Sequence, residues 1–247
     1  MAQITREEIT AYVAENIQTF HKRRLESLAA LKLAKVLKRK NPYLYRAKNI
    51  VTAGELVKGI LDAHLSSQEE GIFGDFLEGL AVFINGKAYG GRKSAAEGID
   101  LEFEKDAIVY FVTIKSGPKW ANADQVRRMK DNFARAKRIR RTNVSNVNVV
   151  CVNGCCYGRQ GKEDKGEYLK LCGQRFWEFI SGDEHLYIDI IEPLGHQAKE
   201  KNDEFLVAYA EVVNQFTKEF MNEYCTADGR SIDWPKIAEL NSGAPAK

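Results

Sequence analysis

The sequence predicts an α/β protein with a mixed central sheet, helices on both faces of that sheet, and helical additions at the N- and C-terminal ends. Strand-like apolar runs at 98–103 and 107–117 flank the charged pair Lys105-Asp106, as in a β-hairpin, and a further apolar run follows at 147–152. Apolar residues at helical spacing lie before and after this region. A chain of 247 residues with a hydrophobic fraction of 44% can bury a core without disulfides or metals.

Helices are predicted for most of the chain before the hairpin. Residues 5–8 (TREE) match a capping box, Asn41-Pro42 is a stop signal, and Thr52 is a suitable N-cap. The expected elements are one long helix over 5–40, a turn over 41–45, a helix over 52–65, a helix over 69–84, and a short strand or loop over 87–93.

Beyond the hairpin, helices alternate with one more strand. The strand ends at Asn153-Gly154, and a helix is closed by Ser181-Gly182. The expected elements are a tight turn over 117–120, a helix over 122–139, a strand over 147–152, a loop over 158–167, a helix over 176–180, a long amphipathic helix over 198–224 and a loose tail over 241–247.

The hairpin contains the candidate catalytic residues. If its turn is centred at about residue 106.5, between the two strands, then Asp100 lies level with Thr113. Alternation along each strand then places Asp100, Glu102, Thr113 and Lys115 on one face. Two acids and an ammonium group at one end of a hairpin predict a metal and catalytic site.

A further acid is a candidate on the helix before the hairpin. Glu70, Gly74 and Glu78 are spaced four residues apart and therefore share one stripe of that helix. Beside a wide apolar surface, the Glu78 carboxylate needs a partner. It either forms a surface salt bridge or faces the Asp100 site as a third acid.

The basic residues are concentrated in two stretches, although the net charge is only +3. Residues 22–48 and 127–141 each contain many lysines and arginines and a single acid. The first stretch is either a solvated helix face or a surface for polyanions, and the scarcity of acids favours nucleic acid.

Several protein classes are disfavoured. The N-terminus lacks the apolar run of a signal peptide, and no stretch of about 18 apolar residues occurs, so a cytoplasmic protein without a membrane span is expected. The five cysteines include no CxxC pair, which argues against a disulfide framework or a zinc finger. They are expected to be reduced thiols, with a reactive Cys155 or Cys156 as the alternative.

Asp100 on one strand followed by x-x-Lys on the next resembles the PD-(D/E)xK nuclease superfamily. Four other sequence segments are more specific: residues 35–43 (KVLKRKNPY), 73–78 (FGDFLE), 113–118 (TIKSGP) and 172–182 (CGQRFWEFISG). These segments resemble the PmeII family of type II restriction endonucleases. The sequence departs from the superfamily at Thr113, where an acid is usual. Some superfamily members place that acid elsewhere, which by resemblance brings in Glu78 or Glu102.

The resemblance implies a function and a cofactor. The expected activity is Mg²⁺-dependent hydrolysis of double-stranded DNA at a short palindromic site by a homodimer. By the same resemblance, Asp100, the Ile114 carbonyl, and Glu78 or Glu102 hold Mg²⁺, while Lys115 orients or deprotonates the attacking water. Residues 1–68 form a helical region for DNA binding or dimerisation, and 69–240 form the nuclease core with its C-terminal helices.

DNA contacts are expected mainly just after the catalytic lysine and in the two basic stretches. The candidate residues are Ser116, Lys119, Asn122, Gln125, Arg127, Arg128, Lys38, Arg39 and Lys40. The missing acid at position 113 motivates an alternative, a catalytically inactive DNA-binding module on the same fold. A structure-specific DNA repair nuclease is a third possibility.

Overall fold

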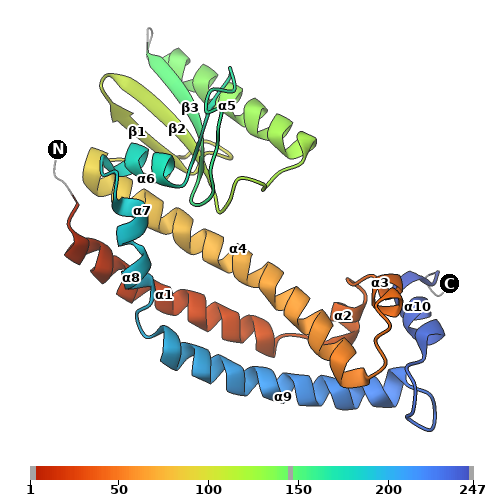
Figure 1. Cartoon of the computed structure of the whole chain (residues 1–247). Coiled ribbons are helices and arrows are strands. Elements are labelled where there is room, and N and C mark those ends of the chain that lie inside the picture. Colours follow the sequence, from red (N-terminus) through yellow and green to blue (C-terminus); the bar gives the residue numbers. More distant parts are fainter. Residues whose placement is uncertain (1–3, 144–146, 245–247) are drawn as a thin grey trace. The chain divides into compact units, whose positions relative to one another are not determined.

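The computed structural model describes residues 4–143 and 147–244, and the chain divides into two compact units (Figure 1). The first unit comprises Met1–Gln18 and Phe73–His196, and the second comprises Thr19–Ile72 and Gln197–Lys247. The unit that contains the sheet thus includes residues 1–18, and residues 19–72 form the second unit together with the C-terminal helices.

The first unit is built on a four-stranded mixed sheet in the order β1-β2-β3-β4. The strands are β1 (Leu101–Lys105), β2 (Ile108–Lys115), β3 (Asn148–Cys155) and β4 (Leu169–Cys172). β1 is antiparallel to β2, whereas β3 is parallel to both β2 and β4. Helix α5 (Ala123–Asn143) makes the crossover that two parallel neighbours require. This confirms the predicted fold class.

The hairpin has the predicted register. Leu101 pairs with Val112, so the next position places Asp100 opposite Thr113. The two-residue turn consists of Asp106 and Ala107, whose φ values are +53° and +59°. Both angles are positive, as in the turns whose twist matches that of a hairpin. The charged pair of the sequence therefore marked the turn to within one residue.

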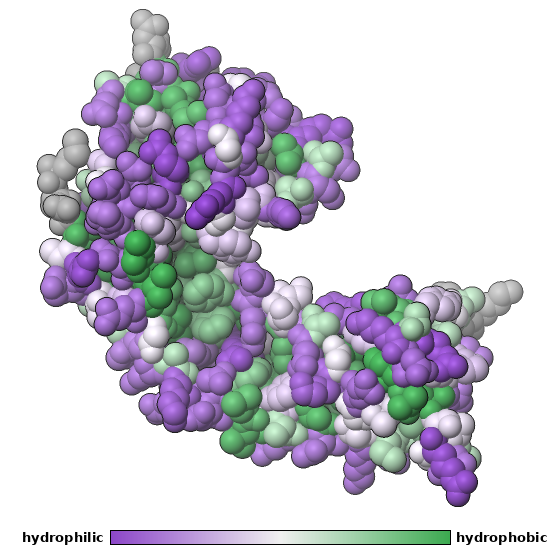
Figure 2. Space-filling model, viewed as in Figure 1, coloured by the Kyte–Doolittle hydropathy of each residue, from purple (hydrophilic) through white to green (hydrophobic). Residues whose placement is uncertain are grey.

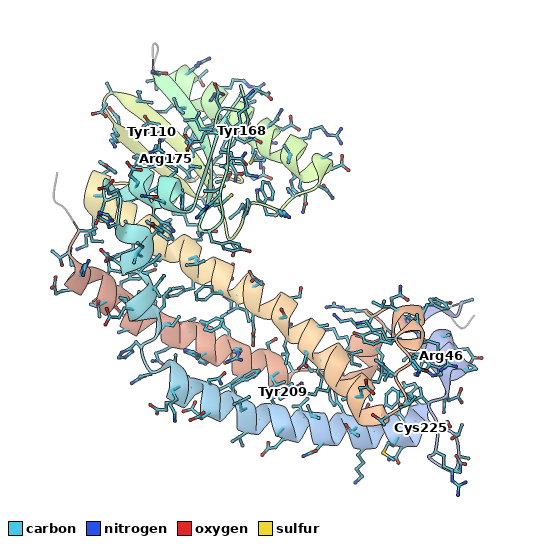
Figure 3. The ribbon with its side chains drawn as sticks, viewed as in Figure 1. Arg46, Tyr110, Tyr168, Arg175, Tyr209 and Cys225 are labelled. Carbon is cyan, nitrogen blue, oxygen red and sulfur yellow. The ribbon has the colours of Figure 1, made fainter. Side chains whose placement is uncertain are left out.

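Helices cover both faces of the sheet. On one face, Val109 and Phe111 of β2 pack with Met129 and Phe133 of α5. On the other, an aromatic cluster joins β1 and β2 to helix α4 (Ala53–Tyr89) and helix α6 (Gln174–Ser181). Within it the rings of Phe103 and Tyr110 stack with centroids 5.0 Å apart (Tyr110 is labelled in Figure 3). The hairpin is therefore packed between two layers of helices.

The third strand continues past its predicted end. Asn153 and Gly154 belong to β3, where they pair with Thr113 and Ile114 of β2. A Cβ on Gly154 would lie 2.2 Å from Cε2 of Phe176, so this glycine permits close packing of α6 rather than a turn. The prediction of a strand ending at Asn153-Gly154 was wrong for that reason. β4 was not predicted at all.

Helix boundaries in the second unit also differ from expectation. The long helix expected to reach Lys40 ends earlier, because the chain turns so that Leu33, Val36 and Leu37 enter the core of that unit. The expected turn at 41–45 is helical, since the Asn41 side chain caps it and Pro42 stands at its first position. The helices that belong wholly to this unit are α2 (Leu33–Leu37), α3 (Pro42–Ala47), α9 (Ala198–Tyr224) and α10 (Trp234–Ser242), whereas α1 (Arg6–Ala29) has its first half in the first unit.

The remaining helical predictions are mostly confirmed. Thr52 caps the helix that follows it, its hydroxyl accepting from the Glu55 N–H at 3.2 Å, but the two helices expected over 52–84 are the single helix α4. α9 has its predicted bounds, and Gly182 ends α6 in a left-handed conformation. The short helices α7 (Leu186–Asp189) and α8 (Ile191–Leu194) were not predicted.

The remaining features are the apolar character of the helices, the state of the cysteines and the end of the chain. In the described part of the chain, no helix is long and apolar enough to span a membrane. The five cysteines are unpaired in the structure. Burial raises the pKa of Cys155 to about 12, which argues against a reactive thiol there. Of the tail expected to be loose, Asn241 and Ser242 belong to α10, and residues 245–247 lie outside the described ranges.

Candidate active site at the end of the hairpin

Asp100 and Lys115 meet where the hairpin strands end. The Asp100 carboxylate oxygen Oδ2 accepts a hydrogen bond from the Ile114 backbone N–H at 2.6 Å. The Lys115 ammonium lies 3.5 Å from the same oxygen. The two side chains are 19% and 33% exposed, so both are constrained yet open to solvent. The pairing expected from the sequence is thus present, with an acid and an amine at one accessible point.

Glu78 of α4 lies in the same electrostatic environment. Its pKa is raised by burial of the carboxyl and by the neighbouring Asp100 carboxylate, while the ammonium groups of Lys93 and Lys115 partly oppose that rise. Lys93 lies 3.4 Å from the Glu78 carboxylate, but the Lys93 side chain is 74% exposed. A cation bound beside Glu78 and Asp100 would stabilise the ionised form of the Glu78 carboxylate.

Glu102 has other partners. Its carboxylate accepts from the Arg92 guanidinium at 2.5 Å and from the Ser94 hydroxyl at 2.8 Å. Backbone hydrogen bonds between Arg92 and Glu102 extend this contact along the open edge of β1. Glu102 therefore fastens the segment that follows α4 to the sheet, and both of its carboxylate oxygens are engaged.

Thr113, at which the sequence is expected to depart from the PD-(D/E)xK pattern, is buried. Its hydroxyl accepts from Nδ2 of Asn153 at 3.1 Å, and it lies 3.5 Å from the sulfur of Met129. The side-chain amide oxygen Oδ1 of Asn153 in turn accepts a hydrogen bond from the Trp120 indole N–H at 3.1 Å. Neither Trp120 nor Asn153 is predicted from the sequence to be a functional residue. The only signal for Trp120 was its place in the turn after Lys115.

The oxygen donors at this site fit a hard cation. The carboxylates of Asp100 and Glu78 and the backbone carbonyl of Ile114 are the ligand types that Mg²⁺ prefers. No group of three or more His, Cys, Asp or Glu side chains suited to a metal occurs within residues 4–143 and 147–244. A site here would therefore comprise two carboxylates and a backbone oxygen, leaving several positions for water or phosphate.

The residues expected to contact DNA are arranged in two groups. Asn122 and Gln125 cap α5 reciprocally, each side chain accepting from the other's backbone N–H at 3.0 and 2.9 Å. Arg127 pairs with Asp124 at 2.5 Å on an exposed surface. Lys119 and Arg128 are exposed, and Figure 2 shows hydrophilic residues over the region of α5.

The second group of expected DNA contacts, Lys38, Arg39 and Lys40, belongs to the other unit. These residues follow α2, and the Asn241 side chain donates to the backbone carbonyls of Leu37, Lys38 and Lys40 at 2.9–3.2 Å. The basic turn is therefore held in one conformation by α10.

A model of the family described as type II restriction endonuclease EcoO109I matches residues 7–202, which is most of the chain. The chain belongs to this family. The matched residues of this EcoO109I family member include Glu78, Asp100 and Lys115, and membership supports type II restriction endonuclease activity, with double-stranded DNA as the partner. The match supports the expected class of enzyme and does not address the PmeII family. No curated protein matches the sequence.

Proposed function

We propose that this protein is a Mg²⁺-dependent endonuclease that cleaves both strands of DNA at a short palindromic site. The observation that carries the proposal is the Asp100 carboxylate, which is fixed by the Ile114 N–H at 2.6 Å and faces the Lys115 ammonium at 3.5 Å. An acid and a lysine at the end of a hairpin, with a helix packed on each face of the sheet, is the arrangement of the PD-(D/E)xK nucleases that the sequence resembles. Among the type II enzymes, the sequence segments quoted above favour similarity to the PmeII family.

Asp100, Glu78 and the Ile114 carbonyl would hold the metal. Bound there, Mg²⁺ would supply a water of lowered pKa and positive charge for the phosphate oxygens. The hydrogen bond from the Ile114 N–H fixes the orientation of the Asp100 carboxylate. The ammonium Nζ of Lys115 would orient the attacking water and donate to the charge that develops on the scissile phosphate.

Glu78 is the better candidate for the acid that is missing at position 113. Its carboxylate is disfavoured by burial and by Asp100, so a dication would relieve both. Glu102 already has two hydrogen-bonded partners, one of them a guanidinium. To act as a ligand, Glu102 would have to leave Arg92 and Ser94.

DNA would be bound through phosphate contacts on both units. Ser116, Lys119, Arg127 and Arg128 follow the catalytic lysine in sequence, and Lys38, Arg39 and Lys40 form the fixed basic turn of the second unit. Asn122 and Gln125 would read bases only by giving up their reciprocal caps. A single centre per chain and a palindromic duplex favour a two-fold homodimer.

The test is incubation of the purified protein with plasmid DNA and Mg²⁺. Discrete fragments are expected, whereas nicking confined to junctions or ends would instead indicate a repair nuclease. Slower migration of the DNA in a gel without cutting would indicate an inactive DNA-binding module, the alternative motivated by the missing acid at position 113. Asp100→Asn and Lys115→Ala should each abolish cleavage yet retain DNA binding measured with Ca²⁺, and full cleavage by either variant would overturn the assignment. Binding should weaken steeply as salt rises, because basic residues displace counterions from DNA.

A further inference from the structure

A hydrogen-bonded chain connects position 113 to the ring that faces the catalytic lysine. Thr113 of β2 and Asn153 of β3 are paired directly in the parallel register, and their side chains are 2% and 1% exposed. Asn153 reaches Thr113 through Nδ2 and Trp120 through Oδ1, at 3.1 Å in both cases. The Lys115 ammonium lies over the Trp120 ring, 5.7 Å from its centroid.

The chemistry of the indole fixes the direction of this chain. An indole N–H can only donate, so the carbonyl oxygen of Asn153 must face Trp120. Its amide nitrogen then faces Thr113, whose hydroxyl oxygen must accept. The hydroxyl proton is left to point toward the Met129 sulfur at 3.5 Å, which is a weak acceptor. Each buried polar group is thus satisfied in only one orientation.

The loop that carries Trp120 is itself held at several points. The carbonyl of Pro118 accepts from the Lys170 ammonium at 2.8 Å. The backbone N–H of Tyr157 donates to the Ser116 carbonyl at 3.0 Å. A Cβ on Gly117 would lie 2.4 Å from Cζ of Tyr157, so the ring of Tyr157 packs directly on this loop. Trp120 therefore has a supported backbone and a ring orientation set by Asn153.

We propose that Thr113, Asn153 and Trp120 are positioning residues that hold the Lys115 ammonium at Asp100. An acid at position 113 would attract the lysine and the metal directly. Here the ammonium is held instead between the Asp100 carboxylate and the face of Trp120, by cation–π attraction. Position 113 then contributes as the buried end of a hydrogen-bonded chain and not as a metal ligand. This inference rests on the proposed function of Lys115.

The test compares single-turnover cleavage rates with DNA affinities measured in Ca²⁺. Trp120→Leu removes the ring and should slow cleavage about tenfold, because a partly desolvated cation–π contact contributes roughly 1–2 kcal/mol. Trp120→Phe keeps a ring but loses the N–H, and should therefore retain more activity than Trp120→Leu. DNA affinity should stay within about twofold in both variants, since only the reacting centre is affected. Trp234→Phe and Trp234→Leu, in the second unit, are the matched controls and should cleave at the parental rate.

A second pair of variants tests the hydrogen-bonded chain. Thr113→Val has nearly the same shape but leaves the Asn153 amide without its acceptor, whereas Thr113→Ser keeps the hydroxyl. Cleavage should fall about threefold in Thr113→Val and remain near the parental rate in Thr113→Ser. If Thr113 acts through Trp120, Thr113→Val should add nothing to Trp120→Leu.

Three results would overturn the inference. The first is parental cleavage by Trp120→Leu while Lys115→Ala is inactive. The second is a Thr113→Val effect of undiminished size in the Trp120→Leu background. The third is a parallel loss of rate, DNA affinity and thermal midpoint, which would indicate a purely structural role. Parental cleavage by Lys115→Ala would instead overturn the proposed function itself, and the two failures are thereby distinguished.

Discussion

Replacing Glu78 by Gln should lower DNA cleavage and raise the stability of the metal-free protein at the same time. The raised pKa of Glu78 has burial as its larger cause and the Asp100 carboxylate as its second. A carboxyl whose pKa is higher in the folded protein than in the unfolded chain, where it is about 4.5, lowers the stability of the fold as pH rises above 4.5. The full loss is present once pH exceeds the raised pKa of the folded state. Glutamine has nearly the same shape but no charge, so it removes this penalty.

The two effects differ in size. Glu78 is one of two carboxylates available to offset the two charges of Mg²⁺, so its loss should exceed the roughly 10- to 100-fold cost of losing a group that merely supports a ligand. We expect cleavage to fall at least about 100-fold and to require more Mg²⁺. Against the gain in stability stands the lost ion pair with Lys93, which is exposed and therefore contributes only about 0.2–1 kcal/mol.

Glu102→Gln is the matched control. Its carboxylate accepts from Arg92 and Ser94 at 2.5 and 2.8 Å, so losing its charge should weaken the attachment of that segment to β1. This variant should lower the thermal midpoint while cleavage is retained. The two Gln variants are therefore expected to change stability in opposite directions, and only Glu78→Gln should lose activity.

The assay is plasmid cleavage as a function of Mg²⁺ concentration, with thermal unfolding of the same preparations in a chelator. Full cleavage by Glu78→Gln together with inactivity of Glu102→Gln would assign the displaced acid to Glu102. Full cleavage by both variants would show that neither glutamate holds the metal. A large drop in the midpoint of Glu78→Gln would refute the argument from its raised pKa.

Three further predictions concern stability and thiol reactivity. His21 and His64 are buried, and their pKa values are lowered first by burial and second by nearby cations. The free energy of unfolding should therefore fall as pH drops below about 6.5, by up to roughly 1.4 kcal/mol per pH unit for each histidine. Acid unfolding of the two His→Gln variants checks this, and an acid unfolding curve unchanged from that of the parent protein would contradict it. Iodoacetamide at pH 8 should label Cys225 (Figure 3) before the four buried thiols, as peptide mass mapping will show. Gly154→Ala should cost about 1–3 kcal/mol, a fall of several degrees in thermal midpoint, because its Cβ would overlap the buried Phe176 ring at 2.2 Å, and an unchanged midpoint would refute that packing argument.

The hairpin and its register could be predicted from the sequence because they depend on local signals. Two β-branched runs around a charged pair define the turn, and the turn then determines that Asp100 lies opposite Thr113. The bounds of α9 were equally accessible, since a sustained amphipathic period needs no knowledge of what packs against it. Asp100 and Lys115 were found for the same reason.

Interactions between distant segments were not accessible. Asn153-Gly154 has the composition of a turn, yet pairing with β2 and the approach of Phe176 keep it in a strand. The helix stops after Ala29 without proline or glycine, because Leu33 is drawn into the core of the second unit. Such outcomes depend on which surfaces meet, and a local propensity of a few tenths of a kcal/mol is easily overridden.

The candidate site shows the same division. By itself the sequence determined that an acid and a lysine share the end of a hairpin, because strand alternation is local. Its resemblance to the PD-(D/E)xK nucleases implied that an acid is missing at position 113. Tertiary structure alone decided that Glu78 shares the electrostatic environment of Asp100, that Glu102 has other partners, and that Thr113 connects through Asn153 to Trp120. Those relations join residues from separate helices, strands and loops, and only packing of these elements creates them.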